Sequence, residues 1–231
     1  MVLDQVVSSV VMDPRGFLLL SGTTATHPAL TWSTSAPATL TGDGTGYVMP
    51  EVIDHLDGRL AELWRLDDLL GGGACLDAGV AELRLVARLI RHGRYDNPTG
   101  TRLWSLAAAL ARFAGWAAFD AGRGAAAQRF WHAGLRAAGA AGDADQGVYV
   151  LSNLALQAAY AGDGTAAIGL LDVARGQVDP TARTVLAMLD LWAVRAHAGC
   201  CSARSRYSSR ATLLSTSMVG MRLPRVTGRS S

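Results

Sequence analysis

The five histidines are the first side chains to test for metal chemistry, because imidazole is the commonest metal ligand in proteins. Structural zinc sites need ligands at short fixed spacings, and zinc proteases carry H-E-x-x-H on one helix face. This chain shows neither pattern, since no two of its histidines are four residues apart; they are His27, His55, His92, His132 and His197. We therefore predict no metal site, and we expect His132 and His197 to be polar residues at helix surfaces.

A glycine run and a pair of carboxylates are the next candidates for chemistry. A phosphate-binding loop follows a strand, opens a helix and carries Lys-Ser/Thr, whereas Gly71–Gly73 follow a helical pattern and the chain contains no lysine. We interpret the run as the end of a helix. Asp67 and Asp68 are adjacent, so on a helix they point about 100° apart and cannot share a proton as a catalytic pair. We expect them at a solvated helix end.

Nucleophilic chemistry has no support in the pattern of serines and cysteines. No serine lies in a G-x-S-x-G elbow. The three cysteines, which include Cys75, form no C-x-x-C pair, and their odd number argues against a disulfide framework. We interpret Cys75 as a small core residue rather than a reactive thiol. The sequence thus predicts a protein of the cytoplasm that is not an enzyme, with no catalytic residues and no cofactor.

The elements that carry these residues are predicted to be helices. Apolar residues recur at three- and four-residue steps after Pro50, which predicts an amphipathic helix over 51–70. A second helix follows the glycine run and closes near Gly93. Asn97 as the cap residue begins a third helix, which runs towards Gly122.

A repeat follows, in which three segments place Ala-Gly at a predicted helix end. The glycines are Gly122, Gly162 and Gly199, spaced by 40 and 37 residues. A period of this size with helix–turn–helix units is typical of tetratricopeptide arrays. Small or bulky residues stand at the matching positions, namely Gly115, Ala118, Ala127 and Trp131 in the first unit and Ala155, Ala158, Ala167 and Leu171 in the second. The third unit loses the pattern after Gly199.

The predicted fold class is all-α: a short tetratricopeptide-like helical repeat array with an irregular N-terminal segment and a C-terminal tail. We expect a linker-like segment over 1–50, the helical domain over 51–199, and a basic, Ser/Arg-rich, disordered tail over 200–231. Residues 1–190 hold 14 arginines and 19 carboxylates, a net charge of −5, whereas residues 191–231 hold seven arginines and no carboxylate. Any binding of duplex DNA should therefore be weak, blind to sequence and dependent on the tail.

From about residue 51 to residue 199 the chain resembles the C-terminal tetratricopeptide-like region of actinobacterial helix-turn-helix regulators of the Xre type. Four sequence blocks carry the resemblance: RLDDLLGGG (65–73), GRYDNPTG (93–100), LARFAGWAAFDAGR (110–123) and AAGDADQGVYVLSNLALQAAYAG (140–162). Members of the family carry a DNA-binding helix-turn-helix ahead of this region. Residues 1–50 lack two adjacent amphipathic helices, so the resemblance implies DNA binding at the level of the family.

The resemblance also implies where a ligand would bind. In tetratricopeptide arrays the first helix of each unit lines a concave groove. The positions that correspond to this groove are Arg112, Trp116, Asp120, Tyr149, Asn153, Tyr160, Asp190 and His197. Mixed aromatic and polar side chains of this kind suit a peptide, a small molecule or a protein partner.

Three hypotheses stand side by side. The first is a transcriptional regulator whose repeat region binds a peptide, a small-molecule effector or a protein partner. The second is a stand-alone interaction module, or a truncated fragment without activity, that does not bind DNA. The third is an α-helical enzyme, for which no catalytic constellation is present. No stretch is apolar enough for membrane insertion, so we expect no membrane partner, and the sequence leaves a homodimer open.

Overall fold

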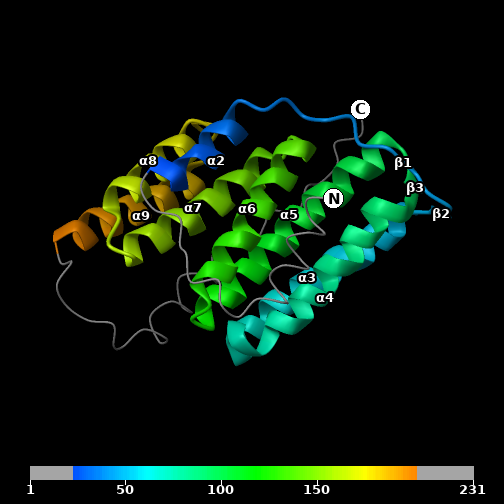
Figure 1. The fold of residues 1–231 in the computed structure, drawn as a ribbon, viewed down its shortest axis with the longest axis horizontal. Coiled ribbons are helices and arrows are strands. Elements are labelled where there is room, and N and C mark those ends of the chain that lie inside the picture. Colours follow the sequence, from blue (N-terminus) through cyan, green and yellow to red (C-terminus); the bar gives the residue numbers. More distant parts are fainter. Residues whose placement is uncertain (1–22, 202–231) are drawn as a thin grey trace.

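The computed structural model describes residues 23–201, and eight helices make up most of this part of the chain (Figure 1). The helices are α2 (Thr23–Ser33), α3 (Pro50–Leu70), α4 (Gly72–His92), α5 (Asn97–Asp120), α6 (Gly124–Ala141), α7 (Ala144–Tyr160), α8 (Gly164–Arg175) and α9 (Arg183–Cys201). Three short strands accompany them: β1 (Gly42–Asp43), β2 (Gly46–Tyr47) and β3 (Gly93–Tyr95). The all-α prediction is confirmed.

Helix pairs stack into a row. Figure 1 shows α3 and α4 at one end and α8 and α9 at the other, with α5, α6 and α7 between them. From α3 to α9 each helix packs on the next, and the first helices of successive pairs also meet: α3 packs on α5, α5 on α7, and α7 on α9. This double set of neighbours gives the stacked helix-pair arrangement that the repeat pattern predicts.

Three glycines show why the repeat needs small residues. Gly122 and Gly162 follow α5 and α7 with φ angles of 74° and 83°, in the left-handed region that favours glycine. Gly115 lies inside α5, and a Cβ there would be 2.3 Å from Nε1 of Trp131 on α6. The tight α5–α6 contact therefore depends on the missing side chain. Gly199 does not end a helix as expected, because α9 continues to Cys201.

Aspartates begin three of the helices. The side chains of Asp143 and Asp163 accept hydrogen bonds from the backbone N–H groups three residues later, at the starts of α7 and α8. Asp96, rather than the predicted Asn97, caps α5 by accepting from the N–H of Thr99. Asn97 has another role: its Oδ1 accepts from the backbone N–H of Leu40 at 2.7 Å.

The prediction of an irregular segment over 1–50 needs correction, because Thr23–Ser33 form α2 and β1 and β2 flank β3 in a small sheet. Helix α2 packs on α6 and α8 (Figure 1). The ring of Trp32 lies where Gly147 leaves room, since a Cβ there would be 1.8 Å from the ring. Tertiary contact thus holds a helix that Pro28 and four threonines do not favour locally.

Residues 1–22, the first part of the predicted linker, lie outside the described residues, and so do 202–231 of the predicted tail. Between residues 23 and 201 no helix has the length and apolarity needed to cross a membrane.

Candidate functional site

Arg112 is the buried charge at the centre of the array. It lies on α5 with 3% of its surface exposed. Its guanidinium carbon is 5.1 Å from the ring centroid of Trp64 on α3 and 4.8 Å from that of Tyr149 on α7. Both distances are within the range of cation–π attraction. Three first helices of successive pairs therefore meet at this one side chain, and we call Arg112, Trp64 and Tyr149 the Arg112 site.

No carboxylate of residues 23–201 forms an ion pair with Arg112. Its Nε is buried and has no hydrogen-bond partner. Burial lowers the pKa of Arg112 to about 10, and the charges of Tyr149 and Asp143 oppose that shift. The side chain therefore stays cationic at neutral pH. Burial without an anion is costly for such a charge, because aromatic rings attract it but accept few of its directed N–H bonds.

The surroundings of the Arg112 site are fixed by packing and contain further polar groups. Trp64 makes an edge-to-face contact with Phe113, with ring centroids 4.9 Å apart and planes at 88°. Gln146 and Asn153 are buried on α7, each about one turn from Tyr149 on opposite sides of it, and Oε1 of Gln146 has no hydrogen-bond partner. The sequence pattern pointed to Tyr149 and Asn153. It missed Trp64 and Gln146, which lie outside the positions carried over from the repeat.

Trp116 and Asp120 lie elsewhere, where the α3–α4 turn meets the end of α5. The indole Nε1 of Trp116 donates to Oδ2 of Asp67 at 3.1 Å. Oδ2 of Asp120 accepts from the backbone N–H of Gly72 at 2.9 Å. Both side chains thus join the first helix pair to the second. Trp116 is also buried, so it is a core residue of this junction.

Asp67 corrects the expectation of a solvated helix end. Its Oδ1 is buried without a hydrogen-bond partner, and burial raises its pKa to about 6. The bond from Trp116 opposes the shift, and the charges of Asp120 and Asp68 add to it. Asp67 and Asp68 are adjacent on α3 and point in different directions, as the sequence predicts. The relevant neighbour, Asp120, comes from a different helix, and no local pattern signals that approach.

The other three predicted groove residues lie towards the last helix. The hydroxyl of Tyr160 accepts from Nη2 of Arg195 at 2.6 Å, and the same guanidinium lies 5.3 Å from the Tyr160 ring. Asp190 pairs with Arg175, and His197 is exposed. The predicted set therefore divides into three places. Among these residues, the place with Arg112, Tyr149 and Asn153 is the one that holds a buried cation without an ion-pair partner.

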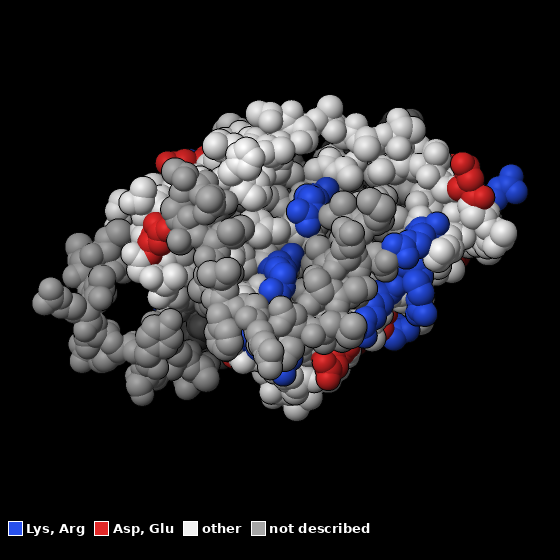
Figure 2. Space-filling model, viewed as in Figure 1, with Lys and Arg blue, Asp and Glu red and all other residues white. Residues whose placement is uncertain are grey.

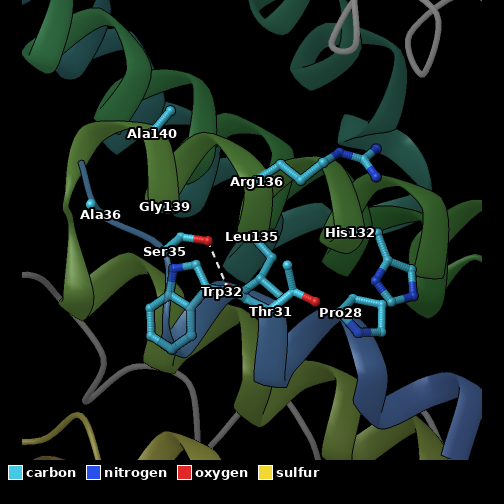
Figure 3. A pocket seen from close by; sticks show the side chains of 10 residues that line it. All are labelled: Pro28, Thr31, Trp32, Ser35, Ala36, His132, Leu135, Arg136, Gly139 and Ala140. Carbon is cyan, nitrogen blue, oxygen red and sulfur yellow. Dashed lines mark hydrogen bonds between the residues drawn. The ribbon is translucent and has the colours of Figure 1, made fainter. Parts of the chain in front are cut away.

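A second buried polar group lies beside a cavity between α2 and α6, shown in Figure 3. The cavity has a volume of about 380 Å³ and is bordered by His132 and Trp32. Both ring nitrogens of His132 are buried without a hydrogen-bond partner. Burial lowers its pKa to about 4, with a further contribution from Arg136. His132 is thus not the surface residue that the sequence predicts, because α2, which was not predicted, covers it.

Metal and thiol chemistry find little support in the described part of the chain. Residues 23–201 contain no group of three His, Cys, Asp or Glu side chains placed to hold a metal ion. Cys75 is buried, as expected of a core residue, and burial raises the pKa of its thiol. A raised pKa disfavours the nucleophilic thiolate.

The charged surface is not uniform. Arg84, Arg88 and Arg91 are exposed on α4 at spacings of four and three residues, so they share one face of the helix. Figure 2 shows basic side chains gathered over the α3–α4 side of the molecule. The net charge of residues 1–190 is negative, but the α4 face of the helical domain is locally basic.

Comparison of the chain with family models, with curated proteins and with solved structures gave no match.

Proposed function

We propose that this chain is the effector-binding region of a cytoplasmic transcriptional regulator and that it binds a peptide, a small molecule or a protein segment at the Arg112 site. The proposal rests on the buried guanidinium of Arg112, which forms no ion pair within residues 23–201 and whose Nε has no hydrogen-bond partner. The assignment to a regulator rests on the four sequence blocks that resemble Xre-type proteins and on the array of helix pairs in which those blocks lie.

The physical argument starts from the cost of the buried charge. An unpaired ion in a protein interior is unfavourable by several kcal/mol, so a fold keeps one where something compensates for it. Trp64 and Tyr149 compensate in part through cation–π attraction. The N–H groups of a guanidinium lie in its plane and match a carboxylate in a two-pronged contact. A ligand with an anionic group would supply the missing acceptors.

Binding can be tested with a displayed library of short peptides with free C-termini, selected on the full chain and on two variants. Arg112→Met removes the charge and keeps much of the packing volume. Arg102→Met is the matched control, because Arg102 is an exposed residue of the same helix that pairs with Asp54 and Asp57. We expect the wild-type chain and the control to enrich peptides with acidic groups. The affinity of Arg112→Met for these peptides should be lower by about tenfold or more. Equal enrichment by Arg112→Met, or none by the wild type, would overturn the site.

The regulatory role needs a separate measurement. We expect a strain that lacks the gene to show altered levels of a defined set of transcripts. Wild-type complementation should restore them and Arg112→Met should not. If transcripts stay unchanged on deletion while peptide binding is retained, the stand-alone interaction module is the better description.

A cluster of exposed apolar side chains supports a protein partner. Leu66, Leu69 and Leu70 at the end of α3 are 43%, 79% and 64% exposed. Large apolar side chains clustered at a surface are typical of contacts with other proteins. A protein partner at this end of the array is compatible with either function.

A further inference from the structure

We propose that the cavity between α2 and α6 is a second binding site, separate from the Arg112 site, and that its ligand is a small carboxylate with a flat aromatic body. The proposal does not rest on the function proposed above. It rests on the shape of the cavity, on the two buried ring nitrogens of His132 that have no hydrogen-bond partner, and on a fixed aromatic wall.

The cavity has walls from two helices that are distant in sequence. In Figure 3, Pro28, Thr31 and Trp32 of α2 lie opposite His132 and Leu135 of α6, and the exposed side chain of Arg136 extends from α6 at the rim of the cavity. Its volume of about 380 Å³ lies at the lower end of the range for small-molecule sites. A compound of one or two fused rings with a short polar group fits this space. A folded protein segment does not.

The polar side of the cavity lacks partners. A neutral imidazole offers one donor and one acceptor, and both nitrogens of His132 are buried without a hydrogen bond. Arg136 lies one helical turn from His132, so the two side chains share one face of α6. Among the described residues no carboxylate pairs with Arg136, and no Asp or Glu lines the cavity. Arg136 is exposed, so water solvates its guanidinium, whereas the buried nitrogens of His132 have no partner. An anion held by Arg136 at the rim could accept the N–H bond that His132 does not otherwise make.

The apolar side of the cavity is rigid. Trp32 is buried, and its ring is seated over two glycines. A Cβ at Gly147 would be 1.8 Å from the ring, and one at Gly139 would be 3.0 Å from it. These backbones therefore hold the indole in one place without a side chain between them. A fixed indole favours stacking or edge contact with a flat aromatic ligand.

The charge of the ligand follows from the number of cations at the site. Among the described residues that line the cavity, Arg136 is the one cationic side chain, because the lowered pKa of His132 leaves that ring neutral near pH 7. A single guanidinium matches a singly charged carboxylate in a two-pronged contact. A phosphate monoester carries close to two charges at this pH and would lack a second cation.

The test uses the full chain and naphthalene-2-carboxylate as probe, with binding followed by titration calorimetry. Naphthalene-2-carboxamide has the same rings without the charge, and naphthyl phosphate carries the alternative anion. We expect the carboxylate to bind about tenfold more tightly than either of them. Tighter binding of the phosphate, or equal binding of the carboxamide, would overturn the assigned ligand class.

Variants then place the probe. Arg136→Gln should weaken binding of the carboxylate about tenfold, and His132→Phe should weaken it by a smaller factor, while both variants keep the helical circular dichroism of the wild type. Arg88→Gln is the control, because it removes an exposed arginine on α4, away from the cavity. Loss of affinity in Arg88→Gln equal to that in Arg136→Gln would show general charge attraction instead of a site.

A spectroscopic readout separates this cavity from the Arg112 site. The indole N–H signal of Trp32 can be assigned by its absence in Trp32→Phe. We expect the probe to shift this signal and to leave the signal of Trp64 in place. A shift of the Trp64 signal with none at Trp32 would move the ligand to the Arg112 site and overturn the proposal. Arg112→Met should leave the affinity for the probe unchanged. The proposal for the cavity and the proposal for the Arg112 site can therefore be contradicted separately.

Discussion

Arg112 and His132 lie on successive helices, and each has a buried nitrogen without a hydrogen-bond partner. Their surroundings differ. Side chains of α3 and α7 pack against Arg112 from within the array, whereas His132 faces a cavity closed by α2. Helices of the repeat array form the surroundings of Arg112, whereas α2, which precedes the array in the sequence, forms one wall of the cavity beside His132. We therefore expect changes around Arg112 to alter the stability of the whole array, and changes around His132 to alter mainly the docking of α2.

The largest expected difference comes from two glycines. Gly115→Leu would push against the ring of Trp131 inside the α5–α6 contact, and we expect it to lower the free energy of unfolding by about 3 kcal/mol. Gly147→Leu would meet only the outer ring of Trp32, so it should release α2 at a cost of about 1 kcal/mol. Urea denaturation measures both losses. Limited proteolysis should cut within residues 23–41 in Gly147→Leu alone, and equal global losses would remove the distinction between the two regions.

Arg112 itself gives the next effect. Arg112→Ala removes two cation–π contacts and leaves a void between Trp64 and Tyr149, so we expect a loss of about 2–4 kcal/mol. Arg112→Met fills most of the space and removes the desolvation cost of the charge, so its stability should be within about 1 kcal/mol of the wild type. Thermal and urea unfolding of the two variants give the comparison. If both lose the same amount, the charge contributes more than the packing.

His132 predicts a dependence on pH. Its pKa is about 4 in the folded chain against 6.5 in an unperturbed histidine, so the unfolded chain binds more protons between these values. The stability of the wild type should therefore fall as the pH drops from about 6.5 to about 4. His132→Phe removes this titration and two unsatisfied nitrogens, and it should be more stable than the wild type by about 1 kcal/mol at pH 7. The difference should grow towards pH 5. A constant difference between the two pH values would contradict the buried position of the ring.

The smallest effect on stability is expected at Asp67, and its dependence on pH is opposite to that of His132. Its pKa is raised to about 6 from 3.8, so the folded chain binds more protons than the unfolded one between these values. The unfavourable contribution of the carboxylate therefore appears as the pH rises through about 6. Asp67→Asn should be more stable than the wild type above pH 6 by less than about 1 kcal/mol, since solvent screens this partly exposed group. The advantage should vanish near pH 4, and a constant advantage in urea midpoints would contradict the shift.

Sequence periodicity was sufficient for the array. The predicted helix over 51–70 corresponds to α3 (Pro50–Leu70), because a long amphipathic pattern bounded by Pro50 and Gly71 leaves few alternatives. Helix α2 was missed for a physical reason. Its sequence lacks acidic and basic residues at its ends and contains Pro28, so its stability comes from Trp32 meeting glycines that are more than 100 residues away.

The candidate sites divide in the same way. Arg112 and Tyr149 were predicted together, because both occupy first-helix positions of adjacent units, and the structure joins them. Asp190 and His197 were grouped with them by the same rule, but the third unit departs from the repeat and they lie apart. The α2–α6 cavity could not be predicted, since it depends on a helix that local propensity does not indicate.

The connection between α2 and α3 has a consequence for how the chain is made. Residues 23–33 leave the ribosome well before α8, which begins at Gly164 and completes the surface on which α2 packs. The 131 residues from Ser33 to Gly164 take about 7–26 seconds at roughly 5–20 residues per second. During this time Trp32 has no Gly147 beneath it, and β1 and β2 can already pair with β3. The order of synthesis therefore allows the small sheet to form before the packing surface of α2 is complete, so α2 docks later than several elements that follow it in the sequence.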